Sequence, residues 1–120
     1  QPVRQVISAD VARELRRMMV QAVERETQLA RVPGYTVGGK TGTAQIPIPG
    51  GYHPTDTIAS FIGFLPDENP EICILVKVDR PKASPWGSQV AAPIFSKVAR
   101  DLVLVLGIAP QSPASAEAKQ

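Results

Sequence analysis

Two apolar runs of strand length, Ile58 to Leu65 and Ile72 to Val78, constrain the fold of this chain more than any other feature. Between them lies Pro66-Asp-Glu-Asn-Pro70, a segment rich in turn-forming residues. Two strands joined by so short a turn are typical of an antiparallel hairpin. Because both runs are apolar on both faces, we expect them inside a sheet that helices cover.

Segments with apolar residues at helical spacing come before and after these strands in the sequence. Ser8 can cap a helix in which Asp10 lies favourably near the positive end. Its apolar positions are Val11, Leu15, Met18, Met19, Ala22 and Val23, and we interpret the methionine pair as core filling. A second helix is expected from about Ser88 to Leu106, ended by Gly107, with Ile94, Phe95, Val98, Leu102 and Val105 at helical spacing. The fold class predicted is therefore α/β, and more narrowly α+β: an antiparallel sheet flanked by helices.

A third strand is expected from Tyr35 to Ile46, with prolines 47 and 49 stopping further pairing. It contains Lys40-Thr41-Gly42-Thr43, which groups a cation, two hydroxyls and a position without a side chain. In an extended strand Thr41 and Thr43 share one face and Lys40 lies on the other. This grouping suits recognition of a carboxylate beside a reacting carbonyl.

The glycines distinguish this segment from an ordinary exposed strand, in which threonine would need no functional explanation. Gly38, Gly39 and Gly42 all weaken a strand, so we expect something to approach the backbone closely here. Residues 34–41 also fit the phosphate-loop pattern G-x-x-x-x-G-K-[ST]. That loop requires a helix directly after Lys-Thr, whereas Gly42, Pro47 and Pro49 would break one. A nucleotide-binding site is therefore the remote alternative.

Charge and composition exclude several other classes of function. The net charge of +2 is too small to indicate a nucleic-acid surface, and Arg13, Arg16 and Arg17 lie on the polar side of the first helix. Cys73 is the single cysteine and is expected to be a buried structural thiol. His53 is the single histidine, expected in a loop, with no partners for a metal site. We expect no metal and no cofactor.

Four segments in order carry a resemblance that extends from about Ser8 to Pro110. They are Gly-Gly-Lys-Thr-Gly-Thr-Ala-Gln ending at 45, the run from Ile58 to Pro70, the run from Ile72 to Pro81, and Val90-Ala-Ala-Pro-Ile-Phe95. Together they resemble the C-terminal part of a class B penicillin-binding protein transpeptidase domain, and K-T-G is one of three motifs of penicillin-recognising serine enzymes. The resemblance implies a partial penicillin-binding/transpeptidase (β-lactamase-like) fold over residues 1–110, followed by a mobile tail at 111–120.

Two of the three family motifs are missing. No serine of this chain has a lysine three residues later, and Asn69, the single asparagine, is not part of an S-x-N motif. We therefore expect the nucleophile, the second motif and a membrane anchor to lie upstream, and this chain alone to be inactive. The location implied is the extracytoplasmic face of the bacterial cytoplasmic membrane.

The resemblance implies a serine D,D-transpeptidase that cross-links peptidoglycan stem peptides and is acylated by β-lactams. Substrate binding would fall to Lys40, Thr41, Gly42 and Thr43, with Lys40 acting electrostatically and the Thr43 backbone N–H acting as an oxyanion-hole donor. The partners implied are stem peptides, β-lactams and the missing N-terminal part of the domain, with possible self-association of the fragment and no nucleic acid. A non-catalytic β-lactam sensor or a degenerate scaffolding homologue is the alternative.

Overall fold

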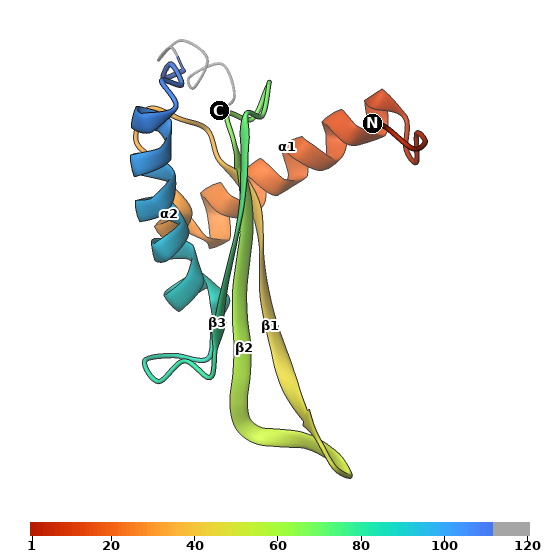
Figure 1. Ribbon diagram of the computed structural model, residues 1–120, viewed down its shortest axis with the longest axis vertical. Helices are drawn as coiled ribbons and strands as arrows, with labels where there is room; N and C mark the ends of the chain where they lie inside the picture. The colour runs from red at the N-terminus through yellow and green to blue at the C-terminus, as the bar shows by residue number, and fades with distance from the viewer. Residues whose placement is uncertain (112–120) are drawn as a thin grey trace.

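A three-stranded antiparallel sheet with α2 packed on one face forms the centre of the computed structural model, which describes residues 1–111 (Figure 1). The strands lie in the order β1-β2-β3. Their bounds are β1 Gly38–Ile48, β2 Gly51–Leu65 and β3 Ile72–Asp79, and the helices are α1 Ala9–Glu26, the short 3-10 helix η1 Gln28–Ala30, and α2 Gly87–Val105. The predicted α+β class and the predicted β2–β3 hairpin are confirmed, and β1 lies at the sheet edge as expected.

The core lies between α2 and the sheet. Phe61 of β2 and Phe95 of α2 are fully buried and meet edge to face, with ring centroids 4.9 Å apart. Ala91, Ala92 and Ala99 face the sheet and are also fully buried, so α2 approaches the strands closely. The core therefore depends on small helix residues packed around two aromatic rings.

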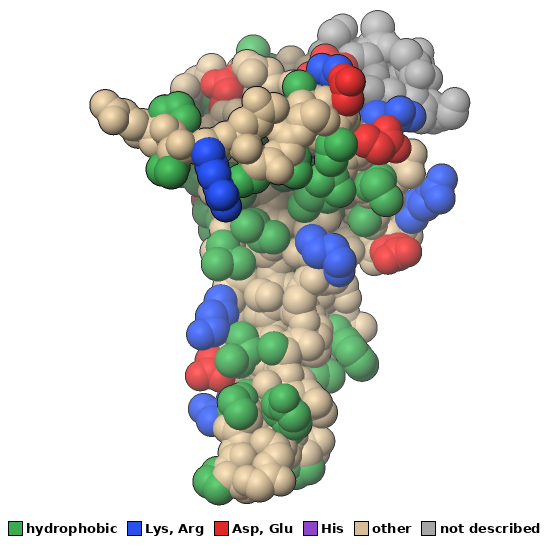
Figure 2. All heavy atoms as spheres, turned by 90° about the vertical axis from the view of Figure 1, so that its right-hand side faces the viewer, with side chains coloured by type: hydrophobic (Ala, Val, Ile, Leu, Met, Phe, Trp, Pro, Cys, Tyr) green, Lys and Arg blue, Asp and Glu red, His purple; other side chains and the backbone are tan. Residues whose placement is uncertain are grey.

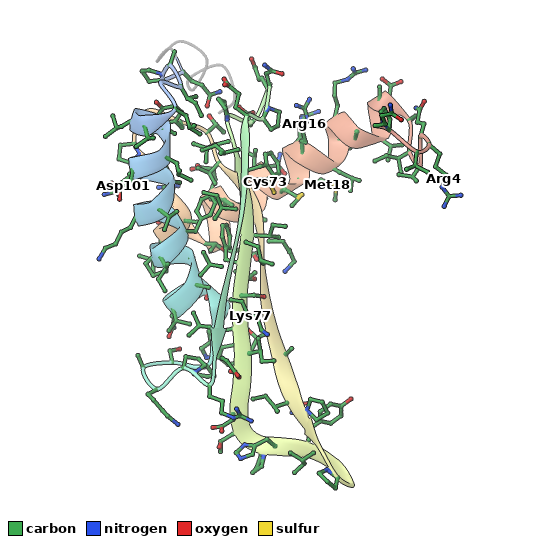
Figure 3. The ribbon with its side chains drawn as sticks, in the orientation of Figure 1. Arg4, Arg16, Met18, Cys73, Lys77 and Asp101 are labelled. Carbon is green, nitrogen blue, oxygen red and sulfur yellow. The ribbon has the colours of Figure 1, made fainter. Side chains whose placement is uncertain are left out.

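The α2 boundaries lie within one residue of those predicted, but its buried face is the predicted one only in part, since Phe95 is buried as expected and other predicted positions are not. Gly107 adopts a φ of +65° just beyond the helix, the left-handed conformation of a glycine stop. Ile94, Val98 and Val105, which were expected to face the core, are exposed. The sheet selects the alanine side of the helix because larger side chains there would hold the helix away from it. Figure 3 places Asp101 on the side of α2 away from the sheet.

The cap of α1 is confirmed, since the Ser8 Oγ accepts a hydrogen bond from the Val11 N–H at 3.2 Å. Only Val20 and Val23 of this helix are buried, because its N-terminal half projects away from the sheet (Figure 1). Met18 is 57% exposed, so the expectation that it fills a core is wrong for the described residues. No described element covers that part of the helix.

Strands β1 and β2 run further than expected. Pro47 pairs with Tyr52 and Ile48 with Gly51, after a register shift between Gln45 and Pro47. Pro47 does not end the strand because β1 is an edge strand, where a missing N–H is tolerated, whereas Pro49 lies in the turn directly after Ile48. The expected loop placement of His53 is also wrong, since this residue lies in β2, where its Nδ1 accepts the Asp56 N–H at 2.9 Å.

Strand β3 is covered on one face only. Ile72, Ile74, Val76 and Val78 pack against the core, while the alternating residues of the strand are exposed. The expectation that helices cover both faces is therefore wrong, and so is the expectation of a buried thiol, because Cys73 is exposed. Figure 3 shows Cys73 and Lys77 on this strand, and Figure 2 looks onto the face of the sheet away from α2, where hydrophobic side chains are visible.

Hydrogen bonds anchor the start of β1 to the turn between β2 and β3 and to the segment after α2. The Gln111 side chain accepts from the Thr36 N–H and donates to Asp67 Oδ1 at 2.8 Å. The Arg16 guanidinium donates to the Asp67 carbonyl at 2.9 Å, which joins α1 to the same turn. Positions 112–120 of the expected tail lie outside the described residues. Within residues 1–111, neither long helix combines the length and apolarity needed to cross a bilayer.

Candidate functional site

The Lys40–Thr43 segment lies in the middle of β1, which pairs with β2 alone. Thr41 is opposite Phe61, Gly42 is opposite Ser60, and the other side of the strand has no partner among residues 1–111. An unpaired edge presents backbone donors and acceptors to which an extended peptide can add as a further strand. The segment singled out by the sequence is therefore accessible.

The two threonines and the lysine lie on opposite faces of the sheet, as predicted. Thr41 is level with Phe61, which packs onto α2, and the Thr43 hydroxyl accepts the Gly87 N–H of α2 at 3.4 Å. Lys40 is level with Ile62 on the open face. The structure thus places the hydroxyls on the side of α2 and the lysine stem on the uncovered side.

The Lys40 ammonium bends back toward its neighbour. Its Nζ donates to the Thr41 carbonyl at 3.1 Å and lies 3.5 Å from the Thr41 Oγ1. In the described part of the chain it has no carboxylate partner, and the side chain is exposed. The positive charge and a hydroxyl are therefore brought together at the strand edge without an internal counter-ion.

Gly42 is enclosed from two sides by residues that the sequence did not single out. A Cβ at position 42 would lie 2.5 Å from the Ser60 Oγ. A Cβ at Gly87 would lie 2.7 Å from the Gly42 carbonyl oxygen and 2.3 Å from that of Ser60. No sequence signal indicates these contacts, because Ser60 and Gly87 are remote along the chain and only the sheet and α2 bring them together.

Gly38 and Gly39 have a different explanation from the one expected. A Cβ at Gly38 would lie 2.2 Å from the Phe64 ring, and one at Gly39 would lie 2.4 Å from the Phe61 ring. The close approach inferred from these two glycines is therefore packing by aromatic rings of β2. They provide no support for a ligand, which leaves Gly42 as the one glycine in the segment beside the candidate site.

The phosphate-loop alternative is excluded. Lys40 and Thr41 lie inside a strand that continues to Ile48, so no helix begins at this position. Without helical N–H groups directed at a phosphate, the pattern lacks the geometry it requires. No group of metal-ligating side chains occurs within residues 1–111.

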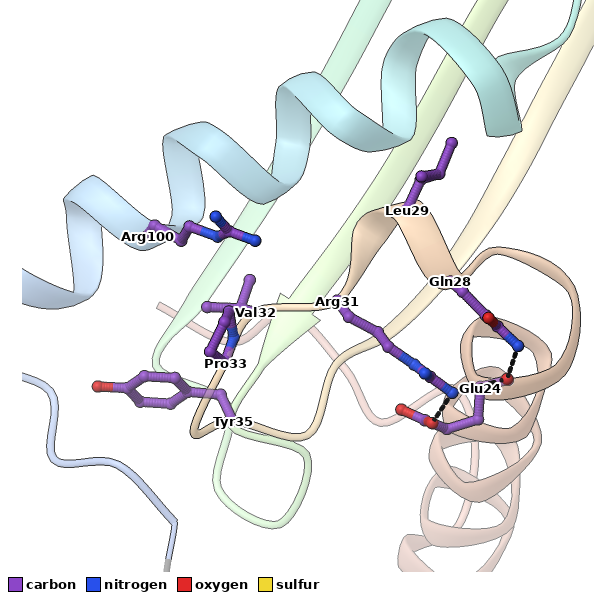
Figure 4. A pocket seen from close by; sticks show the side chains of 8 residues that line it. All are labelled: Glu24, Gln28, Leu29, Arg31, Val32, Pro33, Tyr35 and Arg100. Carbon is purple, nitrogen blue, oxygen red and sulfur yellow. Dashed lines mark hydrogen bonds and ion pairs between the residues drawn. The ribbon is translucent and has the colours of Figure 1, made fainter.

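A separate open hollow lies beside α2 and η1 (Figure 4). It is lined by Glu24, Gln28, Leu29, Arg31, Val32, Pro33, Tyr35 and Arg100. Arg31 and Glu24 form an ion pair in it at 2.5 Å. None of the residues from 40 to 43 lines this hollow, so it is not part of the strand site.

Comparisons with known proteins identify the family of this chain. Residues 1–100 match the family described as the penicillin binding protein transpeptidase domain. The chain is 42% identical over 110 residues to stage V sporulation protein D of Bacillus subtilis, covering 90% of this chain and 17% of that protein. It is 37% identical over 115 residues to the probable peptidoglycan D,D-transpeptidase PenA of Neisseria flavescens, covering 93% of this chain and 29% of that protein.

The fold also matches solved structures. The transpeptidase domain of penicillin-binding protein 3 from Burkholderia pseudomallei superposes with a TM-score of 0.82 at 39% identity, over 92% of this chain and 34% of that structure. The chain thus spans less than a third of the two curated relatives and about a third of this domain structure.

Proposed function

Because this chain belongs to the class B penicillin-binding protein transpeptidase family, we propose that it supplies the substrate-binding strand of a serine D,D-transpeptidase that cross-links peptidoglycan. The observation that carries the proposal is the exposed edge of β1, where Lys40, Thr41 and Thr43 gather without an internal carboxylate. A stem peptide or a β-lactam would lie along this edge as an added strand.

The two threonine hydroxyls are arranged to donate to a carboxylate. A hydroxyl has one proton to donate and can accept from other donors at the same time. Thr43 Oγ1 already accepts the Gly87 N–H, and Thr41 Oγ1 lies within reach of the Lys40 ammonium. Both protons therefore remain available for the substrate carboxylate, and the Lys40 charge strengthens that interaction.

The reaction requires a nucleophile that residues 1–120 do not contain in activated form, since none of their serines has the S-x-x-K spacing. A serine elsewhere in the complete protein would attack the carbonyl between two terminal D-alanines, and the D-alanine amine would leave. An amine of a neighbouring stem peptide would then resolve the acyl-enzyme. The Thr43 N–H would stabilise the oxyanion, a type of interaction that contributes about 3 to 4 kcal/mol to barrier lowering.

The uncovered face of the sheet supports this assignment to a larger domain. Lys40, Ile62 and Leu75 form one row across β1, β2 and β3 on that face, and the two apolar residues are exposed. A covering layer from the rest of the domain would bury both side chains and bring its own groups beside Lys40. We place the complete protein on the extracytoplasmic face of the cytoplasmic membrane, where peptidoglycan is assembled, with residues 1–110 as the C-terminal portion of its transpeptidase domain.

Covalent labelling tests the proposal. The complete protein is incubated with a fluorescent penicillin, and the adduct is located by mass spectrometry. We expect one stoichiometric adduct on a serine outside residues 1–120, and release of D-alanine from a stem-peptide substrate. Residues 1–120 alone should give no adduct. Absence of labelling in the complete protein, or an adduct on a serine of this chain, would overturn the proposal, whereas labelling without D-alanine release would indicate a β-lactam sensor.

A further inference from the structure

The first turn of α2 is joined to the candidate site by its backbone. Trp86 at the N-cap provides no side-chain hydrogen bond to the helix, so the helix start needs another acceptor. The Thr43 hydroxyl is that acceptor for the Gly87 N–H, at 3.4 Å. One residue of the site thus also caps the helix behind it.

The same contact leaves no room for a side chain at position 87. Gly87 is buried, and a Cβ there would approach two backbone carbonyl oxygens, those of Ser60 and Gly42, far inside contact distance. A flexible side chain could rotate away from such an overlap, but a strand carbonyl can move only with its strand. A substitution therefore has to displace either α2 or the sheet.

The packing determines whether α2 or the sheet would be displaced. Ala91, Ala92, Phe95 and Ala99 of α2 have no exposed surface, so sliding the helix outward would open the core along its whole length. Strand β1 is held by pairing on one side only. The added bulk would therefore displace β1 at Gly42 and Thr43 more readily than it would displace the helix.

We propose that Gly87 is a positioning residue for the reaction. By carrying no side chain, it lets α2 begin directly against the Gly42 and Ser60 carbonyls and holds the Thr43 N–H and hydroxyl where substrate needs them. This inference rests on the proposed function, in which Thr43 contacts the substrate. It predicts that the space at position 87 controls acylation through the placement of β1.

The first test compares Gly87→Ala with Gly63→Ala in the complete protein. A Cβ at Gly63 would also overlap its surroundings, but the nearest atoms belong to the Phe95 and Phe61 rings in the core. We expect Gly87→Ala to slow acylation by penicillin by about 10- to 100-fold, less than the 100- to 1000-fold typical of a lost oxyanion donor. Acylation by Gly63→Ala, measured per folded molecule, should stay within about twofold of wild type even where its thermal midpoint falls.

A second variant covers the case in which Gly87→Ala does not fold. The Ser84 hydroxyl accepts the Trp86 N–H at 3.3 Å and bonds to Gln89, which holds the segment that leads into α2. Ser84→Ala adds no bulk, and we expect it to slow acylation about two- to fivefold with an unchanged thermal midpoint. Failure of the complete wild-type protein to be labelled by penicillin would instead count against the proposed function. If wild type is labelled and Gly87→Ala is acylated at the wild-type rate, the role of Gly87 is overturned. If Gly87→Ala does not fold, acylation of Ser84→Ala at the wild-type rate overturns it.

Discussion

Two neighbouring rows of residues across the sheet have opposite environments. The row Thr41, Phe61 and Val76 faces α2, and Phe61 in its centre is fully buried. The next row, formed by Lys40, Ile62 and Leu75, faces away from α2, and Ile62 and Leu75 are 41% and 64% exposed. Since the centre of each row is a large apolar residue, hydrophobicity does not separate them. What differs is whether this part of the chain supplies a covering layer.

The two rows therefore contribute differently to the protein. The α2 row holds this part of the domain together, and the first turn of α2 contacts Thr43 through the Gly87 N–H. The open row combines a cation with apolar surface, which suits an interface that another segment completes. The following experiments test that division.

The largest effect is expected from removing the buried aromatic ring of the α2 row. Phe61→Ala should lower the free energy of unfolding by about 3 to 5 kcal/mol, because a fully buried ring leaves a cavity. Its neighbour Ile62→Ala is the control, with an expected loss below about 1 kcal/mol in residues 1–120, where the side chain is partly exposed. Urea denaturation followed by circular dichroism measures both. Equal losses would mean that the open row is covered in solution.

The next largest effect concerns the charge in the open row. In the complete protein, Lys40→Ala should slow penicillin acylation by about 100-fold with an unchanged thermal midpoint, because it removes positive potential from the carboxylate site. Lys77→Ala is the matched control. Lys77 is an exposed lysine of β3 on the same open face of the sheet as Lys40, and its substitution should leave acylation unchanged. Stopped-flow labelling gives the rates. Normal acylation by a folded Lys40→Ala protein would remove Lys40 from the site.

A third test addresses the uncovered face directly. Exposed apolar surface of this kind favours association, so residues 1–120 alone should form dimers or larger species at high concentration. Leu75→Glu should weaken that association by about tenfold or more. Leu104→Glu, on the outer side of α2 and 80% exposed, should not. Light scattering over a concentration series distinguishes them. A strictly monomeric, cooperatively folded wild-type fragment would show that the open row needs no cover.

The smallest effect is expected at the junction of the two rows. Thr43→Ala removes a hydroxyl but keeps the backbone N–H, so acylation should slow by only about tenfold, at the upper end of the roughly 0.5 to 1.5 kcal/mol of a typical hydrogen bond. Part of that loss comes from the Gly87 N–H, which loses its acceptor. Thr43→Ser should restore the rate to within about twofold. A loss as large as that of Lys40→Ala would instead give the hydroxyl a direct part in the reaction.

Local patterns in the sequence were sufficient for most of the fold. The Ser8 cap, the glycine stop at Gly107 and the hairpin around Pro66 to Pro70 depend on residues close together in the chain, and each expected helix and strand is present, although β1 and β2 extend beyond the predicted ends. The resemblance identified the family, and alternation along a strand predicted that Lys40 and Thr43 face opposite ways. Each of these inferences uses backbone geometry that a few neighbouring residues determine.

Local sequence patterns were enough to predict the helices and strands, their order and the segment that carries the candidate site. Which apolar residues are covered depends on how distant segments pack, so Cys73 and Met18 proved exposed, and Ala99 rather than Val98 faces the sheet. The same packing brings aromatic rings against Gly38 and Gly39 and places Gly42 in contact with Ser60 and Gly87. The physical reason is that burial and close approach depend on atoms from distant segments, whose positions follow from packing the whole sheet against α2 and from no local pattern.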